Sequence, residues 1–154
     1  MNQWIRFNLN GMIFKIRIYG FGHGVEWLKT SFRFKFEDII DYRCDDVKIF
    51  TTECLDLLIE HMGKLLNNKF KRKRELSFFE PDFEFTFIPK TIIKGYPPEL
   101  ENNIPIDISM ELRVFLWHHG LTENHFSMCF ERDDIQRFYD YLLKVKYGKE
   151  EQKV

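Results

Sequence analysis

The feature that most constrains the fold is an Asn-Gly pair placed between two runs of alternating residues. Apolar side chains occupy every second position on both sides of Asn10-Gly11: Ile5, Phe7 and Leu9, then Met12, Phe14, Ile16 and Ile18. A type I′ turn requires positive φ at both central residues, and Asn-Gly adopts it with little strain. We therefore predict an antiparallel hairpin over residues 5–18, with one apolar face and one basic face that includes Lys15 and Arg17.

Alternating residues predict further strands along the chain. These segments are, in order, Trp27–Phe36, Leu76–Phe78, 83–87, 106–116 and 126–130. Residues 47–50 are a candidate for one more short strand. The acidic residues Asp41, Asp45 and Asp46 predict turns before it, and the proline-containing segment 89–103 predicts a long loop. Residues 118–124 are expected to form another turn region.

Two segments have the three- and four-residue spacing of amphipathic helices. The first begins after Thr51, a residue type that caps helices, and ends at Asn67-Asn68, with an apolar stripe of Leu55, Leu58, Met62 and Leu65. The second ends at Gly148 and presents Ile135, Phe138, Tyr139 and Leu142 on one face. The predicted order is βββ(β)αββββα, which is an α+β fold of antiparallel sheet with two helices.

The residues that open the two predicted helices resemble each other. Phe50–Leu55 and Phe130–Ile135 share a phenylalanine, an acidic residue and an aliphatic residue at the same offsets. One explanation is that both helix starts use the same interactions, a hydrophobic staple and an acidic residue near the positive end of the helix dipole. The other is that a ββα unit is duplicated. The length of 154 residues suits one domain with a sizeable core. We expect one domain over residues 1–148 and a charged tail over 149–154.

Composition argues against several classes of protein. The formal net charge of −1 creates no global field that would attract nucleic acid or an anionic membrane. No apolar stretch approaches the ~18 residues of a membrane span. Met1–Arg6 lacks the basic segment followed by an apolar run with which a signal peptide begins. The three cysteines are odd in number and lack C-x-x-C spacing, so we expect reduced thiols in the cytoplasm.

The candidate catalytic and metal-binding patterns are weak. The glycine-rich segment Gly20–Gly24 lacks the following helix that a phosphate site needs. His118 and His119 point to opposite faces of a strand, which makes a zinc site with His125 and Cys129 improbable. No nucleophile motif is present. We expect a protein that is not an enzyme and that needs no metal or cofactor.

Two charged segments are candidate binding surfaces. Glu80, Asp82 and Glu84 surround Pro81, and alternation places Asp82 and Glu84 side by side on a polar strand face open to water. Such exposure does not raise a carboxyl pKa enough for acid catalysis, so this face is either simply solvated or an acidic binding patch. The basic run Lys69–Arg74 follows a helix, and it is either a solvated loop or a phosphate-binding segment.

Three segments carry a family resemblance. The most individual one, Leu76-Ser77-Phe78-Phe79-Glu80-Pro81-Asp82-Phe83-Glu84-Phe85 after a leucine-rich helix, resembles the WapI-type immunity proteins of bacterial polymorphic-toxin systems. Gly24–Leu28 with Ser31-Phe32, and Phe130–Ile135 at the start of the last helix, are similar to the same family. The likeness covers most of the chain in order, and the chain departs from it in Lys69–Arg74 and in Pro97–Asn103.

The resemblance implies a non-enzymatic inhibitor that binds a cognate toxin, often a nuclease, in the cytoplasm of the cell that makes it. An acidic face can imitate nucleic acid before a basic nuclease cleft, so Glu80, Asp82 and Glu84 are the expected partner-binding residues. Two alternatives remain. One is a nucleic-acid-binding accessory protein that uses Lys69–Arg74, and the other is an enzyme with a pocket of convergent polar groups.

Overall fold

The computed structural model describes residues 3–21, 24, 26–78, 82–95 and 103–148. Their first part forms β1 (Ile5–Leu9), β2 (Met12–Tyr19), β3 (Trp27–Phe36), β4 (Ile40–Thr51) and α1 (Thr52–Leu66). Their second part forms β5 (Arg74–Ser77), β6 (Phe83–Ile88), β7 (Thr91–Ile93), β8 (Ile104–Ile106), β9 (Ser109–Trp117), β10 (Leu121–Glu131) and α2 (Arg132–Tyr147). The predicted α+β class with two helices is confirmed.

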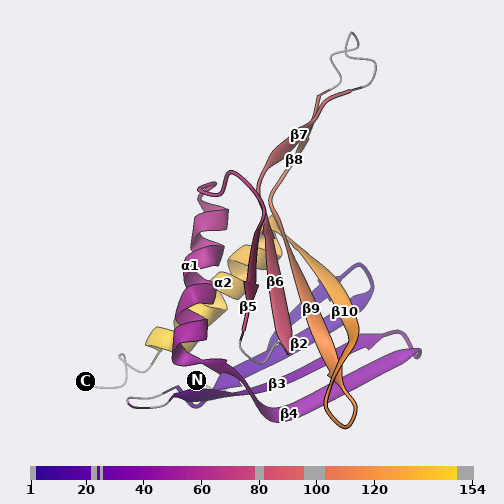
Figure 1. Ribbon diagram of the computed structural model, residues 1–154, viewed down its shortest axis with the longest axis vertical. Helices are drawn as coiled ribbons and strands as arrows, with labels where there is room; N and C mark the ends of the chain where they lie inside the picture. Colours follow the sequence, from indigo (N-terminus) through magenta and orange to yellow (C-terminus); the bar gives the residue numbers. More distant parts are fainter. Residues whose placement is uncertain (1–2, 22–23, 25, 79–81, 96–102, 149–154) are drawn as a thin grey trace.

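The strands form two four-stranded antiparallel sheets of the same design. The N-sheet has the order β1-β2-β3-β4, and the C-sheet has the order β10-β9-β6-β5. Strands β7 and β8 pair separately and project from one end of the C-sheet (Figure 1). In each half a helix follows directly on the last strand of the sheet. The similarity of Phe50–Leu55 to Phe130–Ile135 therefore falls at equivalent points of two ββββα units.

The predicted hairpin at the N-terminus is confirmed. Asn10 and Gly11 have φ of 53° and 87°, and Leu9 pairs with Met12 across the turn. The predicted start of α1 is also confirmed, because the Thr51 side chain accepts a hydrogen bond of 3.1 Å from the Cys54 backbone N–H. Both features depend on a few neighbouring residues, which is why local sequence is sufficient to predict them.

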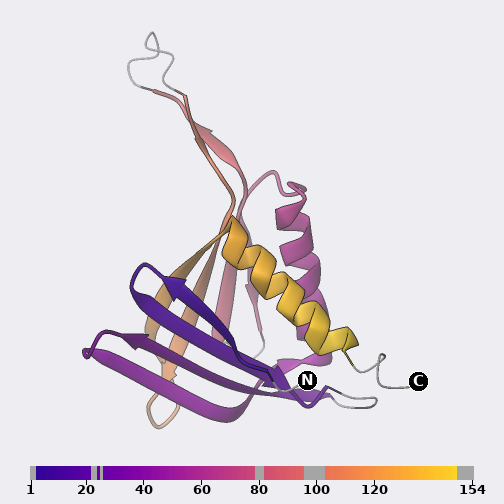
Figure 2. The ribbon, with the colours of Figure 1, turned by 180° about the vertical axis from the view of Figure 1, so that it is seen from behind.

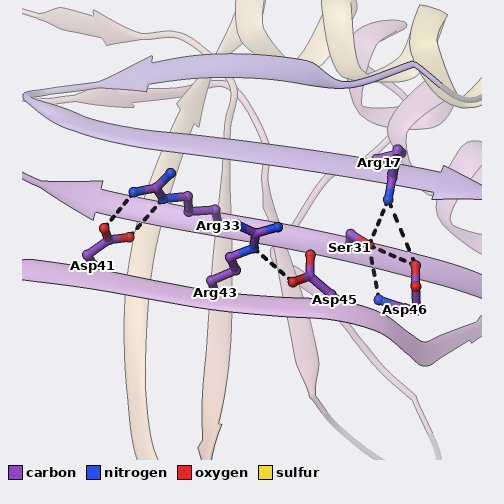
Figure 3. A network of polar contacts seen from close by, with 7 residues as sticks. All are labelled: Arg17, Ser31, Arg33, Asp41, Arg43, Asp45 and Asp46. Atoms are coloured by element: carbon purple, nitrogen blue, oxygen red, sulfur yellow. Dashed lines mark hydrogen bonds and ion pairs between the residues drawn. The ribbon is translucent and has the colours of Figure 1, made fainter.

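Strand β4 corrects the prediction of turns at Asp41, Asp45 and Asp46. These aspartates lie within one strand of 12 residues rather than in turns before a short strand. Their carboxylates face arginines of the same sheet, and Figure 3 shows the resulting contacts. Only Asp46 keeps turn-like geometry, with φ of 55° beside an irregularity in the β3–β4 pairing. Pairing with arginine thus offsets the low strand propensity of aspartate.

The segment from 89 to 131 also differs from the prediction. The expected loop contains β7, and the expected long strand 106–116 is divided between β8 and β9. The division falls at Asp107, whose carboxylate accepts hydrogen bonds from the Ile108 backbone and from the Arg132 guanidinium. Strand β10 already begins at Leu121, so the turn is shorter than the predicted 118–124.

The inner faces of the two sheets share an aromatic core. Ring centroids lie 5.0 Å apart for Phe7 and Phe130, 5.0 Å for Phe32 and Phe83, and 4.4 Å for Phe34 and Phe126. The strands of the two sheets run in clearly different directions (Figure 1).

The helices connect the two halves. Helix α1 contacts both β4 and β6, and α2 contacts β1, β9 and β10 as well as α1 (Figure 2). The predicted Tyr139 is partly buried and packs against the core, and Tyr141, which was not predicted, is buried as well. The Tyr141 hydroxyl accepts a hydrogen bond from the Ile18 N–H at 2.8 Å and donates one to the Gln3 carbonyl at 2.9 Å. The second helix is therefore tied to the first sheet.

Candidate functional site

The outer face of the C-sheet carries the predicted acidic residues of β6. Phe83, Phe85 and Phe87 are completely buried on the inner face, which confirms the alternation along this strand. Asp82 and Glu84 alternate with these phenylalanines in the sequence, and the alternation places them on the outer side. Glu80 lies outside the described residues. The structure therefore places Glu84 on the outer face of β6 and Asp82 directly before the start of that strand.

Glu84 is less open to water than the alternation suggested. Its carboxylate lies 3.2 Å from Nη1 of Arg113 and accepts a 3.2 Å hydrogen bond from the Ser77 hydroxyl. The side chain is only 21% exposed. Arg113 stands directly opposite Glu84 in the β6–β9 pairing, so the register of the sheet creates this contact.

A further carboxylate, Glu111, joins this group and was not predicted. Its oxygen accepts hydrogen bonds from Arg113 Nε at 3.0 Å and from the Ser127 hydroxyl at 3.2 Å. The hydrogen bond from Arg113 is the main reason why the pKa of Glu111 lies below its ordinary value. One guanidinium thus contacts two carboxylates. No local signal could reveal this cluster, because Glu84 and Arg113 are 29 residues apart.

Asp82 faces a different partner. Its carboxylate accepts a hydrogen bond from Nε1 of Trp117, and its backbone carbonyl accepts one from the Phe115 N–H at 2.9 Å. It also lines a largely apolar hollow of about 350 Å³, together with Phe32, Cys44, Val47, Lys48 and Trp117. Asp82 therefore lies where the C-sheet meets β3 and β4, whereas Glu84 lies in the middle of the C-sheet.

Cys44, which lines the hollow, and its neighbour Tyr42 both have a raised pKa. Burial is the main cause that raises the pKa of Tyr42 to about 12, and burial also raises the pKa of the Cys44 thiol. A thiol with a raised pKa carries little of the nucleophilic thiolate at neutral pH. Cys129, on β10, has a raised pKa for the same reason. These cysteines therefore have the character of structural thiols.

The three candidate zinc-binding histidines, His118, His119 and His125, lie around the β9–β10 turn. His118 and His119 follow the end of β9, with ring centroids 4.6 Å apart, and the His125 ring packs 5.2 Å from that of Phe115. Within residues 3–21, 24, 26–78, 82–95 and 103–148, no three histidine, cysteine or carboxylate side chains are grouped as metal ligands would be.

The basic run between α1 and β5 is an exposed loop. Every cation of the segment is exposed: Lys69, Lys71, Arg72, Lys73 and Arg74. Phe70, by contrast, packs against the rings of His61 and Phe87 at 5.8 and 6.1 Å. Lys73 has one carboxylate neighbour, Glu75, at 4.0 Å. The aromatic residue therefore anchors the loop, and the cations project from it.

Comparison with known protein families gives one match of nearly full length. The model of the immunity protein WapI-like family matches residues 5–145, from the start of β1 into the last turn of α2. No curated protein matches the chain. Within the described part of the chain, neither helix is long and apolar enough to cross a membrane. Because the family match spans both sheets and both helices, the chain belongs to the immunity protein WapI-like family.

Proposed function

We propose that this protein neutralises a cognate bacterial toxin, for example a nuclease, by binding it directly and without catalysis. The observation that carries the proposal is the family match over residues 5–145, which supports an antitoxin role in general. The site of action is the cytoplasm of the producing cell. The proposal needs no metal and no cofactor.

The proposed contact surface is the acidic outer face of the C-sheet. Asp82, Glu84, Glu75 and Glu111 lie along this side, with Arg113 between Glu84 and Glu111. Glu80, which precedes β6 in the sequence and lies outside the described residues, belongs to the same proposal. A surface with excess negative charge attracts a basic cleft and accelerates association with it. The hydrogen bonds of Glu84 fix its carboxylate in place, which reduces the entropy lost on binding.

Charge removal tests this surface. Asp82→Asn with Glu84→Gln keeps the shape and hydrogen-bonding capacity of both side chains while it removes two negative charges. We expect association with the toxin to slow by about tenfold, with an unchanged far-ultraviolet spectrum. The partner is the toxin encoded beside this protein, and the measurements are its association rate and the growth of cells that produce both proteins.

The matched control is Glu53→Gln with Asp133→Asn. It makes the same two chemical changes in the exposed first turns of α1 and α2, away from the sheet face. Equal loss in both double variants would point to net charge rather than to this surface. Full protection by the Asp82/Glu84 variant would refute the acidic surface, and absence of any toxin that binds would refute the immunity function.

Nucleic-acid binding by Lys69–Arg74 is the second candidate function, favoured by the exposure of all five cations. It predicts a salt-sensitive mobility shift with RNA or DNA that Lys71→Gln with Arg72→Gln weakens. A shift that this variant leaves unchanged would exclude the loop as the binding site.

A further inference from the structure

The outer face of the N-sheet carries one cation on each of its four strands. The pairing sets Arg6 opposite Lys15, Lys15 opposite Arg33, and Arg33 opposite Arg43. Adjacent strands are ~4.8 Å apart, so these residues form a line of roughly 14 Å across the sheet. This line is called the basic row below, and it consists of Arg6, Lys15, Arg33 and Arg43.

Like charges directly opposite each other destabilise a sheet. Two of the four cations in the basic row form ion pairs with aspartates of the same sheet. Arg33 makes two hydrogen bonds to Asp41, at 2.8 and 2.5 Å, and Arg43 makes one to Asp45 at 2.8 Å (Figure 3). Arg6 and Lys15, in contrast, have no ion-pair partner among the residues that the structure describes. The uncompensated half of the row would gain from an external anion.

The surface around these cations is hollowed and partly apolar. Arg6, Lys15, Arg33 and Lys35 surround Ile13 in a hollow of about 240 Å³. A second hollow of about 350 Å³ shares three of these cations and is lined in addition by Arg43 and Trp4. Trp4 is 38% exposed. Cations next to Ile13 and Trp4 suit a ligand that combines carboxylates with apolar side chains.

We propose that the basic row is a docking surface for an acidic segment of a partner protein. The described face carries the cations Arg6, Lys15, Arg17, Lys29, Arg33, Lys35 and Arg43 and the aspartates Asp41, Asp45 and Asp46, so positive charge is in excess there. The aspartates would repel a continuous phosphate chain laid across the sheet. A few separate carboxylates can instead reach Arg6, Lys15 and Lys35. That the partner is the toxin rests on the proposed function, whereas the surface itself does not.

Neutralising the unpaired end of the row provides the test. Arg6→Gln with Lys15→Gln removes two cations that have no internal partner, so the melting temperature should stay the same or rise. The probe is a fluorescent peptide in which glutamate alternates with leucine. Its affinity for the parent protein should fall as salt is raised, and it should be about tenfold lower for the variant. Amide shifts on peptide binding should map to β1, β2 and β3.

The matched control is Lys90→Gln with Lys94→Gln, two exposed lysines beside β7 that lie outside the basic row and the Lys69–Arg74 loop. It alters the net charge equally. Unchanged peptide binding by the control, with loss in the Arg6/Lys15 variant, supports the basic row. Equal loss in both variants, or no binding of the peptide to the parent, overturns it. If oligothymidylate binds the same residues more tightly than the peptide does, the ligand of the basic row is nucleic acid and not an acidic protein segment.

The inference and the proposed function fail in different ways. If the Arg6/Lys15 variant neutralises the toxin as well as the parent and still loses the peptide, the toxin does not use this surface, and a different acidic partner does. If no toxin binds but the peptide maps to the row, the immunity function fails and the docking surface remains.

Discussion

The N-sheet and the C-sheet have the same strand order and the same aromatic inner face, but opposite charge on their outer faces. On the N-sheet face the cations Arg6, Lys15, Arg17, Lys29, Arg33, Lys35 and Arg43 outnumber the aspartates Asp41, Asp45 and Asp46. On the C-sheet, the carboxylates Glu75, Asp82, Glu84 and Glu111 outnumber the nearby cations Arg113 and Lys73. The difference shows that the core fixes the shared architecture and leaves the outer faces free to serve different contacts.

The connections between the strands also differ between the halves. Only residues 20–26 separate β2 from β3 in the sequence, whereas the equivalent connection from β6 to β9 contains the paired strands β7 and β8. Ile92, Ile93, Ile104 and Ile106 on this projecting pair are all exposed. An isolated two-stranded pair is only marginally stable in water, so this part of the C-half depends least on the core.

The largest predicted effect tests whether the two halves unfold together. Phe50 and Phe130 occupy equivalent positions before α1 and α2, and both are fully buried. Replacing either with alanine should lower the free energy of unfolding by about 3–5 kcal/mol. Because the aromatic core joins both sheets, denaturant unfolding should stay a single transition in both variants. Two separate transitions in either variant would show that the halves are independent domains.

The next effect concerns the turn that sets the N-sheet register. Gly11→Val should lower the free energy of unfolding by about 1–3 kcal/mol, because a β-branched residue resists the φ of 87° found there. The control is Gly63→Ala on α1, where φ is helical and the new Cβ would lie 3.4 Å from the Tyr139 hydroxyl oxygen. Thermal melting checks both variants. A Gly11→Val protein as stable as the Gly63→Ala protein would contradict the turn.

A smaller effect distinguishes the charges of the two faces directly. Arg113→Gln removes the only cation between Glu84 and Glu111, so their repulsion should lower the melting temperature slightly. Arg33→Gln loses the Asp41 contact but also relieves repulsion from Lys15 and Arg43, so we expect a smaller change or none. Raising the salt concentration should reduce the difference between the two variants. Equal falls in melting temperature would mean that the faces do not differ electrostatically.

The last predicted effect, on the pH dependence of stability, is absent at neutral pH and appears only at alkaline pH. The pKa of Tyr42 is raised from 10 to about 12, so its contribution to stability is complete below pH 10 and is lost as the pH rises through 12. The same tyrosine packs on Phe34, with ring centroids 5.2 Å apart. Tyr42→Phe should therefore lose less stability over this range than the parent, while Tyr147→Phe should behave like the parent. Denaturant unfolding at several alkaline pH values measures this, and equal losses in all three proteins would refute the shift.

The amino-acid sequence alone determined the features that depend on neighbouring residues. Positive φ at Asn10-Gly11, the Thr51 cap and the alternation of Phe83, Phe85 and Phe87 each follow from a short segment, so the hairpin, α1 and the orientation of β6 were predictable. The family resemblance also rested on short segments. By contrast, Asp41 in β4 and the break at Asp107 were mispredicted, because Arg33 of β3 and Arg132 of α2 stabilise them from other elements.

Only the tertiary structure decided which charges meet. The C-sheet cluster needs Glu84 and Glu111 to face Arg113 from two strands, and the basic row needs residues 6, 15, 33 and 43 to align across four strands. A shift of one residue in any of these pairings would move the side chains to the other face of the sheet. Register is set by the whole buried core rather than by any one segment. For that physical reason the sequence predicts which residues are charged and outward, and the packed sheets determine the surfaces that they form.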